Sequence, residues 1–129
     1  MKGILIVLCL VAALLAAPQA AFAQATAEEE PAVRQARELF EQGIATFEAG
    51  DTAAACDLFQ RSFDLRASPT ALYNLALCRQ ERGEREAAID CFRRYVAMRG
   101  PDLPAAERAE IVAAVEGMGG TLDEPTTAT

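Results

Sequence analysis

The most reactive side chains in this sequence are its four cysteines, Cys9, Cys56, Cys78 and Cys91. A cysteine can serve as a nucleophile, bind a metal ion or form a disulfide, depending on its neighbours. Here no two cysteines form a Cys-x-x-Cys pair, and the chain contains no histidine, the residue most often used as a general base and metal ligand. The cysteines are therefore candidates for disulfides or buried thiols, and not for redox or metal chemistry.

Other catalytic patterns are also absent. The sequence contains no Gly-x-Ser-x-Gly motif, and its one lysine, Lys2, lies at the start of the chain, so no phosphate-loop lysine follows. The GMGG stretch at 117–120 follows a helical pattern, whereas a nucleotide-binding loop follows a strand. The consecutive carboxylates at 28–30 are expected to be solvated. We therefore predict a protein that is not an enzyme and holds no cofactor or metal ion.

The N-terminal segment has the features of a secretory signal peptide. Lys2 precedes an unbroken apolar run over residues 4–17, and the sequence AFA at 21–23 supplies the small residues that a signal peptidase recognises. The run has 14 residues, fewer than the roughly 20 that span a bilayer. We expect a signal peptide over residues 1–23, cleaved at its end or after Ala25. The alternative is an uncleaved membrane anchor.

The charge and the cysteine content of the chain limit the classes of partner and the cellular compartment that we expect. The formal net charge is −7 at neutral pH, and loss of Lys2 makes it one unit more negative. Because an acidic surface repels phosphate backbones, nucleic acid is not expected as a partner, and no membrane contact is expected after cleavage. An exported chain, periplasmic or secreted, meets an oxidising environment in which disulfides persist. Its three remaining cysteines leave at least one thiol unpaired within a monomer.

The pattern of the residues after the N-terminal segment predicts helices. Apolar residues recur at helical spacing from Val33 onward, and no segment alternates apolar and polar residues over the length of a strand. Residues 24–35 are interpreted as a flexible lead or a helix extension, and residues 119–129 as a disordered tail. Asp51 and Ser68 are expected to cap helices, the latter with proline as the first helical residue. The expected helices end near Gly50, Ala67, Arg82, Gly100 and Glu116.

Two stretches of the chain resemble each other. EAGDTAAACDLF at 48–59 and ERGEREAAIDCF at 81–92 share Glu, Gly, two Ala, Asp and Phe at an offset of 33 residues. A repeat of this length, built as two antiparallel helices, is typical of a stacked helical array. Each helix pair in such an array needs its neighbour to bury its apolar face. The alternative is an unrelated five-helix bundle.

The repeated positions resemble the tetratricopeptide repeat family. The first unit supplies Leu39, Gly43, Gly50-Asp51, Ala55, Phe59 and Ser62, and the second supplies Leu72, Leu75-Ala76, Gly83-Glu84, Ala88, Phe92 and Tyr95. Departures from the family pattern include Gln42, where Leu is usual, and Ser62 and Tyr95, where Ala is usual. The resemblance implies an all-α fold of the α-solenoid type. It places two helix-turn-helix repeats at 36–68 and 69–100, followed by a capping helix at 101–118.

The resemblance also suggests how the cysteines are arranged. In an array of this family, the second helix of one unit lies antiparallel to the first helix of the next. Cys56 and Cys78 then fall at the same level of that contact, so we hypothesise a disulfide between them that pins the two units together. Cys91 would remain a free, buried thiol. The alternative is that all three cysteines are buried thiols that fill core space.

Members of this family usually bind peptides on the concave face, which is lined by the first helix of each unit. The residues that would line it here are Arg37, Phe40, Glu41, Ile44, Phe47, Thr70, Tyr73, Asn74, Leu77 and Gln80. Several are apolar, which suits an amphipathic helix or an extended apolar peptide. The alternative is that the aromatic members pack beneath residues 27–35 or against a second copy of the chain.

These observations predict an exported interaction module that binds a protein or peptide partner in the cell envelope. The first alternative is a self-associating structural subunit, a homodimer or larger assembly, that stacks through its first helix. The second is an enzyme accessory or small-molecule carrier, which would need an enclosed pocket. Concentration-dependent size measurements separate the adaptor from the self-associating subunit.

Overall fold

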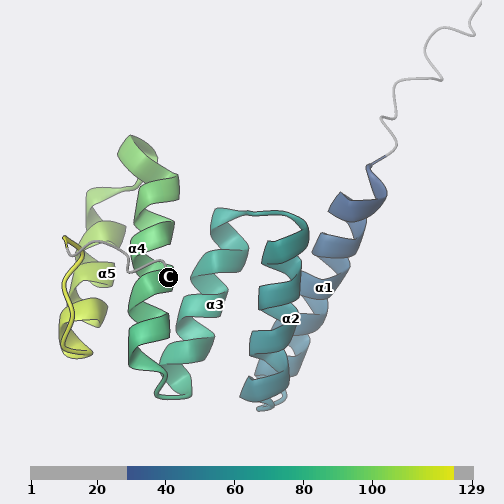
Figure 1. Ribbon diagram of the computed structural model, residues 1–129, viewed down its shortest axis with the longest axis horizontal. Helices are drawn as coiled ribbons and strands as arrows, with labels where there is room; N and C mark the ends of the chain where they lie inside the picture. Colours follow the sequence, from purple (N-terminus) through teal and green to yellow (C-terminus); the bar gives the residue numbers. More distant parts are fainter. Residues whose placement is uncertain (1–28, 124–129) are drawn as a thin grey trace, which may run out of the picture.

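The computed structural model describes residues 29–123, and within this range it contains helices and no strand. The predicted all-α fold is therefore confirmed. Helices pack on their neighbours in chain order, and they lie side by side as a row from α1 to α5 (Figure 1). The elements are α1 (Pro31–Glu48), α2 (Thr52–Leu65), α3 (Pro69–Glu81), α4 (Arg85–Arg99), the short 3₁₀ helix η2 (Gly100–Asp102) and α5 (Ala105–Gly117).

Local chemistry sets the helix boundaries. The side chain of Asp51 accepts a hydrogen bond from the Ala54 backbone N–H at 3.1 Å, and that of Ser68 accepts one from the Ala71 N–H at 3.2 Å. Gly50 has a φ of 88° and Gly83 a φ of 73°, a region that residues with a Cβ rarely adopt. These two glycines therefore allow the tight turns between α1 and α2 and between α3 and α4.

The first helix begins at Pro31, so residues 31–35, interpreted from the sequence as part of a lead or a helix extension, are helical. Proline is well suited to the first turn because the N–H that it lacks would have had no partner within the helix. The segment expected to be a signal peptide, residues 1–23, lies outside the described residues. Within residues 29–123 no helix has the length and apolar character needed to cross a membrane.

The core runs continuously along the row of helices. Its largest fully buried side chains include Phe59, Leu72, Phe92 and Ile111, contributed by α2, α3, α4 and α5 respectively. Gly43 marks the closest approach of α1 and α2, because a Cβ placed there would lie 2.7 Å from Cε1 of Phe59. The repeat pattern therefore corresponds to real packing: a small residue on one helix receives an aromatic ring from the next.

Two departures from the family pattern have structural explanations. Ser62 is buried, and its Oγ donates a hydrogen bond to the backbone carbonyl of Ala36 at 2.7 Å. This bond joins α2 to α1 and satisfies a polar group that would otherwise be costly to bury. Tyr95 is also buried, but its hydroxyl donates to the Glu107 carboxylate on α5. Burial and this carboxylate raise the pKa of Tyr95, so the ring anchors α5 as a neutral hydroxyl.

The fifth helix covers the end of the row, since Ile111 and Val115 are buried against the core. The chain beyond it differs from the expectation of a disordered tail from residue 119. Leu122 is partly buried against the core, and Nε of Arg93 donates a hydrogen bond to the Thr121 carbonyl at 2.7 Å. The Thr121 carbonyl thus links the start of the tail to α4, and Leu122 packs it against the core. The tail beyond residue 123 is outside the described range.

Candidate binding surface on the first and third helices

The residues predicted to bind a partner come from equivalent positions of two helices. Five lie on α1 and five on α3, and each residue of the first set precedes its counterpart by 33 positions. Within each helix their successive spacings are three, one, three and three residues, which places them on one side of that helix. We call this set the α1–α3 face; its members are Arg37, Phe40, Glu41, Ile44, Phe47, Thr70, Tyr73, Asn74, Leu77 and Gln80.

The apolar members of the α1–α3 face form its base. Phe40, Ile44, Phe47 and Tyr73 are partly buried and pack against the core. The Phe40 ring lies 5.6 Å from that of Phe59, and the Tyr73 ring lies 5.9 Å from that of Phe92. Part of each ring thus packs against the core and stabilises the fold. Leu77 differs, because 37% of it remains exposed.

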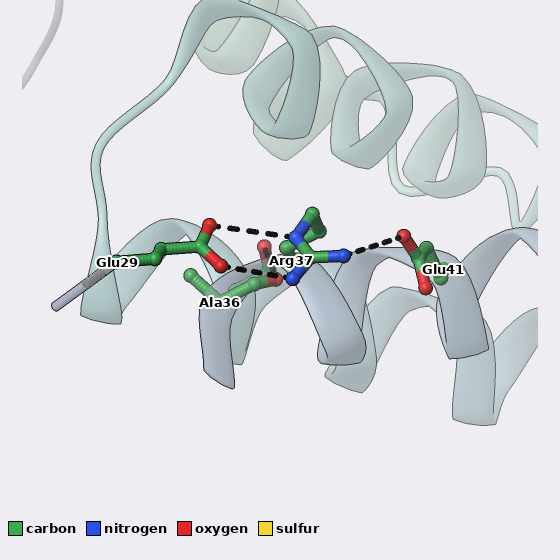
Figure 2. A network of polar contacts seen from close by, with 5 residues as sticks. Glu29, Ala36, Arg37 and Glu41 are labelled. Carbon is green, nitrogen blue, oxygen red and sulfur yellow. Dashed lines mark hydrogen bonds and ion pairs between the residues drawn. The ribbon is translucent and has the colours of Figure 1, made fainter. Parts of the chain in front are cut away.

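The polar members are more exposed, and several already have partners. Arg37 forms ion pairs with Glu29 at 2.9 Å and with Glu41 at 3.6 Å (Figure 2). Nδ2 of Asn74 donates a hydrogen bond to the Thr70 carbonyl one turn earlier, at 2.9 Å. One amide donor of Asn74 is therefore used within its own helix.

The structure brings three predicted residues together in one pocket of about 160 Å³. Arg37 and Phe40 come from α1, and Thr70 comes from the first turn of α3. The pocket also contains residues that the sequence analysis did not identify, among them Glu29, Arg66 and Ser68. Arg66 and Ser68 lie in the turn between α2 and α3, so only the fold brings them near α1. The helix-capping role of Ser68 was the one sequence signal in this turn.

The cysteines divide as hypothesised from the sequence. A disulfide joins Cys56 on α2 to Cys78 on α3, with their Cα atoms 5.7 Å apart, and thus links the two predicted units. Cys91 on α4 is free and buried. Burial raises the pKa of the Cys91 thiol, although Arg79 donates a hydrogen bond to its Sγ at 3.4 Å and acts in the opposite direction. A buried thiol with a raised pKa is a poor nucleophile.

A comparison with known protein families finds a match in the second helix pair. Residues 70–98, which span α3 and nearly all of α4, match the family model of the tetratricopeptide repeat. The chain contains a tetratricopeptide repeat. No curated protein matches the chain significantly, and neither does any solved structure. The match supports the predicted family over the second helix pair. The first helix pair has the same helix order and the same turn glycine, and it lies outside the matched residues.

The tetratricopeptide repeat gives the α1–α3 face a functional context. Repeats of this family are typically interaction scaffolds and not catalytic sites. The described part of the chain contains no group of three or more residues suited to hold a metal ion. The repeat thus supports a protein-binding role at the level of the family.

Proposed function

We propose that this protein is an exported tetratricopeptide repeat adaptor that binds a protein or peptide partner of the cell envelope on its α1–α3 face. The main support for the proposal is a set of partly exposed apolar side chains at equivalent positions of the first helix of each pair. They are Phe40, Ile44 and Phe47 on α1, and Tyr73 and Leu77 on α3. Phe40, Ile44, Phe47 and Tyr73 each pack partly against the core, and Leu77 is 37% exposed, so all five have surface that can contact a partner.

Binding would rest on apolar complementarity. Side chains already held by the core lose little conformational freedom when a partner arrives, so a preformed apolar face binds at low entropic cost. An amphipathic helix or an extended apolar segment would match a strip of this kind. Export is proposed from the N-terminal sequence, whose charged start, apolar run and small-residue site are those of a cleaved signal peptide.

The alternative of stacking through α1 is less well supported. The side of α1 that faces away from the rest of the chain carries exposed polar residues, among them Arg34, Gln35, Glu38 and Gln42. Its apolar residues are instead turned toward the core. A self-associating end would be expected to expose a contiguous apolar patch.

A substitution on the α1–α3 face tests the adaptor proposal. Leu77→Asp places a charge where the partner would bury an apolar side chain, so we expect partner binding to fall about ten-fold or more. The matched control is Leu65→Asp on α2, because Leu65 is 40% exposed and Leu77 is 37% exposed, but Leu65 lies outside the face. The measurement is quantitative capture of envelope proteins by the immobilised wild type and the two variants.

The expected result is one or more proteins that wild type and Leu65→Asp retain and that Leu77→Asp loses. Equal retention by both variants, or equal loss from both, would contradict the proposed face. Thermal unfolding of both variants checks that the fold is intact, which the exposure of both positions predicts.

A further inference from the structure

Two carboxylates extend the α1–α3 face where its helices end. Glu48 is the last residue of α1, and Glu81 is the last residue of α3. Glu48 follows Ile44 by four residues and Glu81 follows Leu77 by four, so each lies about one turn further along the same side of its helix. The turns that follow α1 and α3 lie at the same edge of the row of helices (Figure 1). We call Glu48 and Glu81 the acidic end of the face.

The carboxylates of the acidic end are placed where a helix disfavours negative charge. The last turn of a helix carries partial negative charge from its free carbonyl groups, so a cation stabilises this position and an anion does not. The last turn of α1 has no basic residue. The last turn of α3 has Arg79, but its guanidinium donates hydrogen bonds to Gln60 at 2.8 Å and to Cys91 at 3.4 Å. Helix stability therefore does not account for glutamate at these two positions.

The acidic end sets the charge of the surface that a partner would meet. The charged members of the α1–α3 face itself are Arg37 and Glu41, and these two form an ion pair at 3.6 Å. Glu48 and Glu81 are both exposed, and within residues 29–123 neither side chain has an ion-pair or hydrogen-bond partner. An apolar segment that lies along the face would therefore have two unpaired carboxylates at one of its ends.

We propose that the occupant of the α1–α3 face is an apolar segment of the partner that carries a basic residue, lysine or arginine, at the end that meets Glu48 and Glu81. The inference rests on the proposed function for the apolar contact. It adds the charge of the partner and the direction in which its segment lies.

Charge complementarity supports this occupant. A cation at the acidic end would be attracted by two carboxylates and by the partial negative charge of two helix ends, whereas an acidic residue would be repelled. The formal net charge of −7 acts in the same direction over a longer distance and favours the approach of a basic segment. Apolar contact along the face thus provides the binding, and the acidic end selects among apolar segments.

The test uses synthetic peptides that share one amphipathic segment, with leucines at helical spacing, and differ only in two terminal residues. These residues are lysines, glutamines or glutamates, placed at the N-terminal end in one set and at the C-terminal end in another, so that both directions of binding are covered. Affinities for the purified protein are measured by calorimetric titration.

In one of the two sets, the lysine peptide is expected to bind about three- to ten-fold more tightly than the glutamine peptide, and the glutamate peptide more weakly than either. The difference between lysine and glutamine should shrink as salt is raised from about 50 mM to about 500 mM, because salt screens exposed charges. Equal affinities within both sets, or no binding of either lysine peptide, would overturn the inference.

A double substitution assigns the preference to the acidic end. Glu48→Gln with Glu81→Gln is expected to bring the lysine peptide to the affinity of the glutamine peptide. The control is Asp57→Asn with Glu116→Gln, which changes the net charge equally at exposed positions of α2 and α5. We expect this control to keep the preference for lysine. Equal loss from both double variants, or loss from neither, would contradict a role for the acidic end.

Thermal unfolding separates a binding role of the acidic end from a structural one. Because a carboxylate at the end of a helix opposes the helix dipole, the Glu48→Gln, Glu81→Gln variant is expected to unfold at the same temperature as wild type or higher. A clearly lower unfolding temperature would assign the two carboxylates to the fold and count against the inference.

The charge preference and the apolar face can fail separately. If the lysine and glutamine peptides bind equally and Leu77→Asp weakens both, the apolar face stands and the charge preference is refuted. If Leu77→Asp leaves the binding of the glutamine peptide unchanged, the apolar face is refuted instead. The comparison of the lysine and glutamine peptides then still decides whether Glu48 and Glu81 select a basic residue.

Discussion

Reduction of the Cys56–Cys78 disulfide is expected to lower the free energy of unfolding by about 3 kcal/mol. The bond closes a loop across a sequence separation of 22 residues, and a cross-link of that span restricts the unfolded chain by this order of magnitude. It also joins α2 to α3, the contact through which the first helix pair packs on the second. The measurement is denaturant unfolding of the same chain with and without a non-thiol reductant.

The control for this experiment is the Cys91→Ala variant. Because Cys91 is free, the difference between its oxidised and reduced forms should equal that of the wild type. Cys91→Ala is itself expected to lower stability somewhat, because the thiol is fully buried. A reduction effect below about 1 kcal/mol, or one that disappears in Cys91→Ala, would contradict the role assigned to the disulfide.

Replacement of Phe59 by alanine is expected to lower the free energy of unfolding by about 3–5 kcal/mol. The ring is 1% exposed, fills the space over Gly43 and contacts the ring of Phe40. Its removal leaves a cavity between α1 and α2, and the cost of this cavity adds to the loss of buried apolar surface. Denaturant unfolding monitored by circular dichroism measures the loss.

Phe63→Ala is the matched control, since Phe63 lies on the same helix one turn later and is only partly buried. The guanidinium of Arg94, on α4, lies over its ring at 5.0 Å from the centroid. We expect a loss less than half that of Phe59→Ala. Equal losses would show that the space over Gly43 is not the tightly packed centre of the first helix pair.

Most of the fold could be predicted from local signals. Gly50 and Gly83 indicated turns because each sits in a doubled motif, and Asp51 and Ser68 indicated helix starts through their capping geometry. The repeat of similar residues at an offset of 33 positions then related the first helix pair to the second. Such signals can be recognised in a single sequence because they depend on residues near one another in the chain.

The features that sequence reasoning missed depend on contacts between distant segments. The pocket forms only where Arg66, in the turn after α2, comes near Arg37 on α1. The start of the tail is fixed by Arg93 and by the partial burial of Leu122, although its composition alone resembles a disordered end. Neither case has a periodic pattern, so the sequence could predict the α1–α3 face but not the polar site beside it.

The most direct test of the account is photo-crosslinking at Leu77 of the full chain in its own cell, with Leu65 as the control position. Each residue is replaced in turn by a photoreactive phenylalanine derivative, and the products are identified by mass. The account predicts a covalent product between position 77 and a different protein, and no such product from position 65. A product that contains only two copies of this chain, or the same products from both positions, would contradict a partner-binding α1–α3 face.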